Sequence, residues 1–76
     1  MPVPNDLTIR EMVIFTRQVF NLTQREYAQD VGTNQTTVSF MERGFVPNTK
    51  SNLISAIIEY FEQAVNEVNK KYETLA

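Results

Sequence analysis

The sequence contains no cysteine and no histidine. Without cysteine, the chain can form neither a disulfide framework nor a thiolate metal site. Without histidine, it lacks the commonest general base, the commonest metal ligand and any histidine-dependent catalytic triad. The sequence also shows no nucleophile–base pair and no glycine loop of the kind that binds phosphates. We therefore expect a protein that is not an enzyme and that uses neither a metal nor a cofactor.

Long apolar segments are missing as well. No run approaches the roughly 20 apolar residues that a helix needs to cross a bilayer. The first residues, Met1 to Asp6, do not place a basic segment before an apolar stretch, so no signal peptide is predicted. A chain of 76 residues, of which 42% are hydrophobic, is enough for one modest core. We expect a single cytoplasmic domain over residues 1–76, with no membrane partner.

Positive charge is in short supply, since the formal net charge is −2. Neutralisation of phosphates supplies much of the affinity of proteins for DNA, so this balance argues against nonspecific coating of nucleic acid. The charges are unevenly placed, however. The segment Thr33 to Met41 carries none, and Arg25 and Arg43 flank it. A neutral segment flanked by arginines remains compatible with a specific DNA-binding face.

Local patterns predict an all-α fold of about four helices. Thr8-x-x-Glu11 and Thr23-x-x-Glu26 are capping boxes, which satisfy free amides at helix starts. The first box opens a helix over residues 9–19, in which apolar residues recur on one face: Ile9, Met12, Val13, Val19 and Phe20. The second opens a short helix that ends at Gly32, where a left-handed residue is expected.

A third and a fourth helix follow. Asn34 is a suitable N-cap for the third, which stops at Gly44. From residue 49 to residue 76 the pattern predicts one long helix, because apolar residues recur at alternating intervals of four and three: Ile54, Ile58, Phe61, Val65, Val68, Tyr72 and Leu75. At about 1.5 Å per residue this helix is roughly 40 Å long, so its last turns should extend beyond a compact body.

The last part of this stripe is a candidate dimerisation element, which we call the seam: Val65, Val68, Tyr72 and Leu75. Additional apolar residues widen the stripe between Leu53 and Ala64, as packing into a globular core requires, whereas the seam stays narrow. A homodimer contact is the leading interpretation. Packing of the seam on the chain's own body and contact with a different protein are the alternatives.

Residues Thr23 to Gly44 have the features of a helix-turn-helix. Two helices that cross over a tight turn need a small residue where their backbones approach, and Ala28 supplies it. They also need a turn residue that tolerates a positive φ and an apolar residue on the second helix, and these are Gly32 and Val38. We therefore expect a compact helix-turn-helix domain with a long C-terminal helix.

The same segment resembles the lambda-repressor-like helix-turn-helix family, which includes phage repressors, Cro and the Xre-type bacterial regulators. The resemblance covers about residues 9–58 and depends on the following residues: Arg17, Leu22-Thr23-Gln24, Ala28, Gly32, Val38-Ser39, Glu42, Gly44 and Pro47. Thr33 and Phe40 depart from the pattern, which usually has an apolar residue at the first position and a polar or basic one at the second.

The resemblance implies roles for individual residues. Arg17 and Glu42 should form an ion pair between the first and third helices, and Gln24 and Arg43 should contact phosphates. The predicted DNA-binding surface comprises Gln24, Arg25, Asn34, Gln35, Thr36, Thr37, Ser39, Phe40 and Arg43. Gln35, Thr36 and Phe40 should face base edges, where glutamine can pair with adenine and apolar groups can meet the thymine methyl.

These residues favour a sequence-specific transcriptional regulator, a homodimeric repressor that places its recognition helices in successive major grooves of double-stranded DNA. The alternative is a protein-interaction module, similar to an antitoxin or an antirepressor, that uses Phe40 and the seam to hold a regulatory protein. A further alternative is that the polar residues of the third helix form an ordinary solvated face with no binding role. Arg25 and Lys50 can likewise be solvated charges that contact no phosphate.

Overall fold

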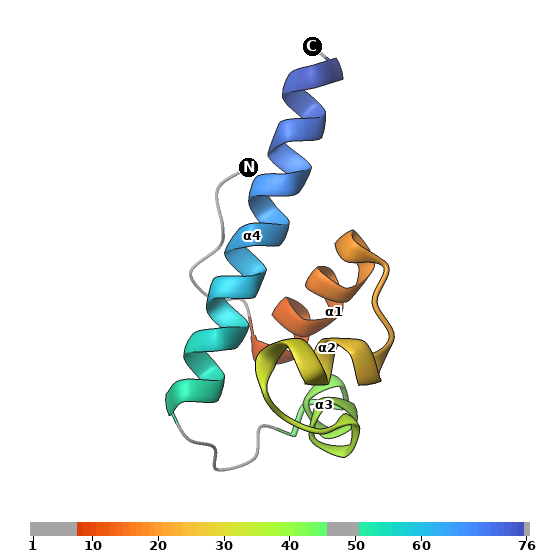
Figure 1. Ribbon diagram of the computed structural model, residues 1–76, viewed down its shortest axis with the longest axis vertical. Coiled ribbons are helices and arrows are strands. Elements are labelled where there is room, and N and C mark those ends of the chain that lie inside the picture. Colours follow the sequence, from red (N-terminus) through yellow and green to blue (C-terminus); the bar gives the residue numbers. More distant parts are fainter. Residues whose placement is uncertain (1–7, 46–50, 76) are drawn as a thin grey trace.

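The computed structural model describes residues 8–45 and 51–75. It is all-helical over these residues, as predicted, with α1 (Ile9–Phe20), α2 (Gln24–Val31), α3 (Gln35–Glu42) and a long α4 (Ser51–Leu75). The three short helices form a body beside the lower half of α4, and the last turns of α4 extend beyond this body (Figure 1). Pro47 and Lys50 lie outside the described residues.

The helix starts are those that the capping residues predict. The Thr23 hydroxyl accepts a hydrogen bond from the Glu26 backbone N–H at 3.1 Å, and the Glu26 carboxylate accepts one from the Thr23 backbone N–H at 2.9 Å. The bond that the Glu26 carboxylate accepts from the Thr23 backbone N–H is the main cause that lowers the pKa of Glu26 below its ordinary value, and the Thr23 side chain adds to this effect. The side chain of Asn34 caps α3 by accepting from the Thr37 N–H at 2.8 Å.

Three helix ends share one geometry. Asn21, Gly32 and Gly44 adopt left-handed φ values of 55°, 84° and 94° directly after α1, α2 and the cap of α3. At the end of α3, the Phe45 N–H donates to the Phe40 carbonyl at 3.0 Å, and the Gly44 N–H donates to the Met41 carbonyl at 3.1 Å. These two bonds define a Schellman motif, which ends the helix with its last carbonyls satisfied.

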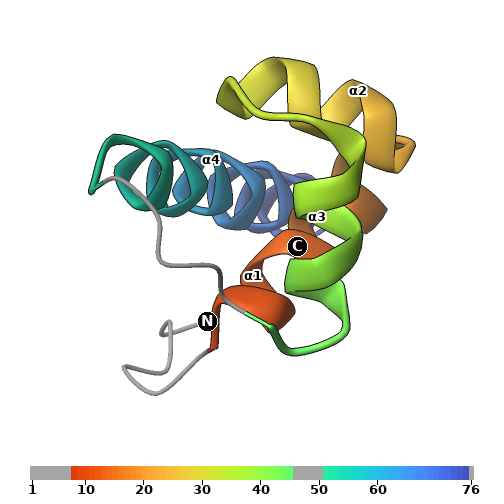
Figure 2. The same cartoon turned by 90° about the horizontal axis from the view of Figure 1, so that it is seen from below.

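The core lies where the inward faces of all four helices meet. Its buried residues are Val13, Tyr27, Ala28, Val31, Val38, Met41 and Ile57. α4 packs mainly against α1 and also against α2, while α3 packs against α1 and α2. Figure 2, the view from the α3 end, shows α3 crossing α2 steeply after the turn, with α4 on the other side of the body.

Three aromatic rings connect the N-terminal helices to α4. The Tyr60 ring stacks between Phe20, at a centroid distance of 5.4 Å, and Tyr27, at 5.5 Å. The Tyr60 hydroxyl donates to the Asp30 carboxylate at 2.7 Å. Burial, together with this hydrogen bond and the nearby negative charge of Asp30, raises the pKa of Tyr60 to about 12. The pKa of Tyr27 is also raised above its ordinary value, mainly because its ring is buried. Such stacking contributes beyond the area that it buries.

Tyr60→Phe should keep the ring stack and remove the hydrogen bond to Asp30. We expect the free energy of unfolding at neutral pH to fall by about 1 kcal/mol. Because the folded-state pKa of Tyr60 is raised above the unfolded value, its contribution to stability is present below pH 10 and is lost as the pH rises toward about 12. Urea unfolding of both proteins across this range should show the stability difference narrowing. A difference that stays constant with pH would contradict the assignment.

Ile58, a residue of the predicted apolar stripe beside the short helices, lies outside the core. Ile57, Phe61 and Ala64 are buried, but Ile58 is 38% exposed. The reason is the helical period, because one residue turns the helix by about 100° and carries Ile58 off the face centred on Ile57. The face of α4 that enters the core is therefore centred beside the stripe predicted from the four–three spacing, and not on it.

The end of α4 projects beyond the body, as the length of the helix predicts. The molecule measures 41 Å along its longest axis and 25 and 20 Å along the others. In the seam, Val65 and Val68 are half-buried, Tyr72 is 69% exposed, and the side chain of Leu75 lies outside the described ones. Over the described residues, no helix is both long and apolar enough to cross a membrane.

Candidate nucleic-acid interface

The turn between α2 and α3 is built from the three residues that the sequence singled out. Ala28 and Val38 are buried where the two helices meet. Gly32 has a φ of 84° and a ψ of 34°, and the Thr33 N–H donates to the Ala28 carbonyl at 2.8 Å. Glycine adopts this conformation without the strain of a Cβ atom. The turn therefore sets the direction in which α3 leaves α2.

The outward side of α3 carries a ridge formed by Thr36, Phe40 and Arg43. The residues are spaced by four and three, so they follow one another along a single helix face, and all three are exposed. Phe40 is 46% exposed although it is apolar. The opposite face, with Val38 and Met41, is in the core. Gln35 is exposed at the start of α3, beside the ridge.

Other predicted interface residues are occupied within the chain. The Asn34 Oδ1 atom accepts from the Thr37 N–H, and also from the Thr37 hydroxyl at 3.0 Å. Ser39 is half-buried. These three residues are therefore bonded within the chain or partly buried. The exposed side chains on the outward side of α3 are those of Gln35, Thr36 and Phe40.

Glu42, at the end of α3, connects three helices. The Arg17 Nη1 atom on α1 donates to both carboxylate oxygens of Glu42 at 2.7 Å, and the Arg17 Nε atom donates to the Leu22 carbonyl at 3.0 Å. The two side chains of this ion pair are only 25% and 14% exposed. The Gln24 side-chain amide on α2 donates to the same carboxylate at 3.1 Å. The ion pair that the resemblance implies is thus present, and it fixes α3 relative to both other short helices.

Gln24, for which the resemblance implies a phosphate contact, makes a contact within the chain. Its side chain is half-buried and its side-chain nitrogen donates to Glu42. The reason is the position of Gln24 at the start of α2, directly beside the end of α3. Arg25, the next residue, is exposed, as is Arg43, so the two arginines that flank the neutral segment are both accessible.

Arg10 is a residue that the sequence interpretation missed. Its Nε atom donates to the backbone carbonyl of Glu42 at 2.9 Å, while its side chain stays exposed at the end of α3 that carries Arg43. The signal was available, because Arg10 lies seven residues before Arg17 and so on the same face of α1. Arg10 adds a third accessible arginine to the body formed by the short helices.

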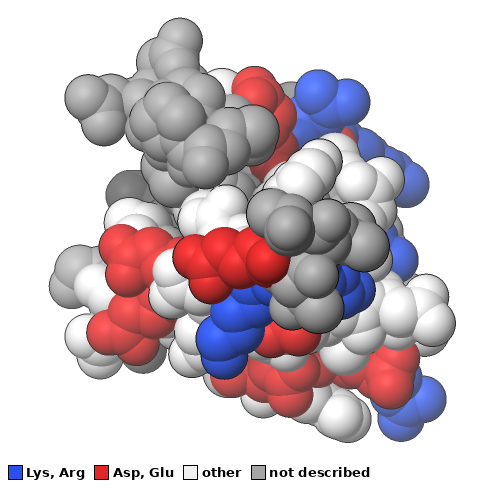
Figure 3. Space-filling view, turned by 90° about the horizontal axis from the view of Figure 1, so that it is seen from above, with Lys and Arg blue, Asp and Glu red and all other residues white. Residues whose placement is uncertain are grey.

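α3 carries one charged residue, Glu42, whose carboxylate is paired with Arg17. Arg43 follows directly after α3 and is exposed, and the exposed Arg10 donates to the Glu42 carbonyl. An anion approaching this end of α3 therefore meets two arginines without a free carboxylate on the helix itself. Figure 3, a view along α4 from its C-terminal end, shows the opposite face of the molecule, where carboxylates lie over the α4 side and also among the Lys and Arg side chains.

Among the described residues, no group of three side chains is placed to hold a metal ion. A hollow of about 370 Å³ borders the Arg17–Glu42 pair, and its lining residues are Ile14, Arg17, Gln18, Asn21, Leu22 and Glu42. Comparison with known protein families, with curated proteins and with solved structures found no match to this chain.

Proposed function

We propose that this protein is a sequence-specific DNA-binding transcriptional regulator that acts as a homodimer on an inverted repeat. The observation that carries the proposal is the ridge of α3, an exposed face with no free carboxylate, next to three accessible arginines. By the sequence resemblance given above, Gln35, Thr36 and Phe40 stand at base-facing positions of the lambda-repressor-like motif, although Phe40 departs from its usual residue type. Occupation of an operator would block polymerase, so repression by occlusion is the simplest mechanism.

In this proposal α3 lies in the major groove. Gln35 can form two hydrogen bonds to adenine N6 and N7, and the methyl group of Thr36 and the ring of Phe40 can contact thymine methyl groups. Arg25 and Arg43 would contact phosphates on either side of the groove, with Arg10 beside Arg43. Phosphate contacts set the register of the protein on DNA, while base contacts select the sequence.

The network around Glu42 supports this role. A recognition helix must be held to within a fraction of an ångström, because hydrogen bonds to bases tolerate little displacement. Glu42 accepts bonds from Arg17 and Gln24 through its carboxylate and from Arg10 through its carbonyl. The end of α3 is thereby fixed from two other helices, while its outward face stays free.

A second candidate function is supported by two exposed aromatic rings. Phe40 is 46% and Phe45 is 66% exposed, and the hydrogen bond between their backbones brings them to the same end of α3. Exposed aromatic residues are also common at protein interfaces. The same scaffold would then bind a regulatory protein through this end of α3. The effects of the two substitutions described next distinguish the candidates, since a protein-binding module has no base-specific or salt-dependent affinity for DNA.

Gln35→Ala should weaken binding to the preferred DNA site by about 1–3 kcal/mol and relax selectivity at one base pair in each half-site. Gln63→Ala is the matched control, because Gln63 is exposed on α4, away from α3. Binding to specific and random DNA is compared by fluorescence anisotropy at one ionic strength. An equal loss on both DNAs would remove the base-reading role and leave a phosphate contact.

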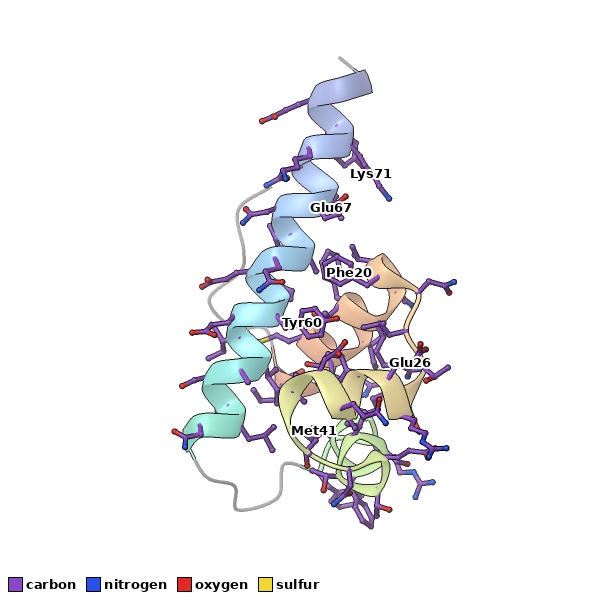
Figure 4. The ribbon with its side chains drawn as sticks, viewed as in Figure 1. Phe20, Glu26, Met41, Tyr60, Glu67 and Lys71 are labelled. Carbon is purple, nitrogen blue, oxygen red and sulfur yellow. The ribbon has the colours of Figure 1, made fainter. Side chains whose placement is uncertain are left out.

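Arg43→Ala should weaken binding to all DNA sequences alike. The slope of log affinity against log salt should become shallower by about one unit per protomer, because one phosphate contact and its released counterion are lost. Lys71→Ala is the control, since Lys71 lies near the far end of α4 (Figure 4). If the slope is the same in wild type and Arg43→Ala, the residue does not contact a phosphate.

A further inference from the structure

The last turns of α4 form a projection, which we call the tail (residues 65–75). It lies at the end of the molecule opposite α3 and rises beyond the end of α1 (Figure 1). Tyr72, in the tail, is the most exposed large apolar side chain among those described, at 69%. Aromatic residues are enriched at protein interfaces, so the residues that lie beside Tyr72 on the helix bear on which partner fits this surface.

Tyr72 belongs to a row of residues with a spacing of seven: Ile58, Val65 and Tyr72. Seven residues fall only about 20° short of two full helical turns, so the three side chains lie along one side of α4. The row lies beside the face that enters the core, which explains why Ile58 is exposed while Ile57 and Ala64 are buried. Ile58 and Tyr72 are therefore available to a partner, and Val65 between them is half-buried.

The spacing favours an identical helix as the partner. When two identical helices pack in parallel, residues that repeat every seven positions meet their own counterparts across a two-fold axis. The charges of the tail also favour a second copy as the partner. Its two glutamates, Glu67 and Glu73, balance its two lysines, Lys70 and Lys71. Such a neutral surface selects neither DNA nor a strongly charged peptide, and it does not repel a copy of itself.

The position of α3 sets the orientation. Figure 4 shows Met41 directed from α3 into the body, toward α2 and α4, so the ridge on the other side of α3 faces away from the tail. Two copies that place both ridges on one side of a DNA duplex must direct both tails away from it. Antiparallel tails would instead carry the two α3 helices to opposite ends of the assembly.

We infer that the tail pairs in parallel with the tail of a second copy along the row of Ile58, Val65 and Tyr72. The orientation rests on the proposed function, since it follows from both α3 helices facing one duplex. The pairing of two tails, in contrast, is inferred from the spacing and charges of the tail and does not depend on DNA binding. A parallel pair places the two Tyr72 residues opposite each other, whereas an antiparallel pair centred on Val65 places Tyr72 opposite Ile58.

Because the chain has no cysteine, single-cysteine variants can distinguish these arrangements. We would prepare Val65→Cys, Tyr72→Cys, Ile58→Cys and the control Glu73→Cys, and equilibrate each in a glutathione redox buffer without DNA. A disulfide requires Cα atoms within about 7 Å, so dimers form where counterparts face each other. Non-reducing gels give the dimer fraction, and circular dichroism checks that each variant is folded.

We expect Tyr72→Cys to form at least about tenfold more disulfide dimer than Glu73→Cys, because paired thiols have a high effective concentration. Val65→Cys should also crosslink. Dimers of Tyr72→Cys that appear only in a mixture with Ile58→Cys would show antiparallel tails and overturn the inference. Crosslinking of every variant at the level of Glu73→Cys would show that a second copy does not cover the row. Since no DNA is present, either result is separate from a failure to bind DNA.

Discussion

Replacing Glu42 by alanine is expected to destabilise the fold by about 3 kcal/mol, the cost of breaking a largely buried ion pair from one side. The substitution leaves the Arg17 guanidinium and the Gln24 amide without their shared acceptor. A small domain has only about 5–15 kcal/mol of stability in total, so the loss is a large part of it. Urea unfolding followed by circular dichroism measures the change.

Two further variants separate the charge of Glu42 from its hydrogen bonds. Glu42→Gln keeps an acceptor for Gln24 and removes the charge, so its loss should be smaller than that of Glu42→Ala. The double variant Arg17→Met, Glu42→Leu replaces both partners with apolar groups, which is often close to neutral. Its stability should therefore lie well above that of Glu42→Ala alone. Equal stability of wild type and Glu42→Ala would show that the pair contributes nothing to the fold.

Truncation after Ala64 is expected to give a folded monomer whose affinity for an inverted-repeat site falls by about 100-fold or more, because the second half-site is no longer engaged at high effective concentration. The buried residues Ile57, Phe61 and Ala64 remain in the truncated chain. Some packing is lost with the half-buried Val65 and Val68, so a modest loss of stability accompanies the change.

The matched variant for this truncation is Tyr72→Ala, which removes an exposed ring and leaves the core intact. Sedimentation of the three proteins gives their oligomeric states, and anisotropy gives their affinities for a full and a half site. Tyr72→Ala should shift the monomer–dimer equilibrium toward monomer and weaken full-site binding more than half-site binding. If the truncated chain is still a dimer, the dimer contact lies outside residues 65–76.

The starts of the three short helices and the end of α2 were predictable because local chemistry sets them. Thr23, Glu26 and Asn34 supply side chains for the free amides of helix starts, and Gly32 supplies the left-handed residue at a helix end. These are interactions between residues a few positions apart, which a sequence displays directly. The ion pair of Arg17 and Glu42 is not local and was expected only from the family resemblance.

The contacts that were not predicted join residues far apart in the sequence. The Tyr60 ring stacks on Phe20 and Tyr27, and nothing in the local pattern around Tyr60 selects those two partners. On α4, the apolar residues occupy two adjacent faces, so the spacing alone did not show that Ile57 enters the core and Ile58 stays outside. The bond from Gln24 to Glu42 likewise depends on how α2 and α3 meet.

The central claim, that the ridge of α3 reads a DNA sequence, is tested most directly by selecting bound DNA from a random pool with the full chain at one stated ionic strength. We expect enrichment of an inverted repeat whose half-sites are about 34 Å apart, one turn of the double helix. Gln35→Ala should select the same repeat with one position in each half-site relaxed. A selected pool indistinguishable from the starting one would contradict the claim.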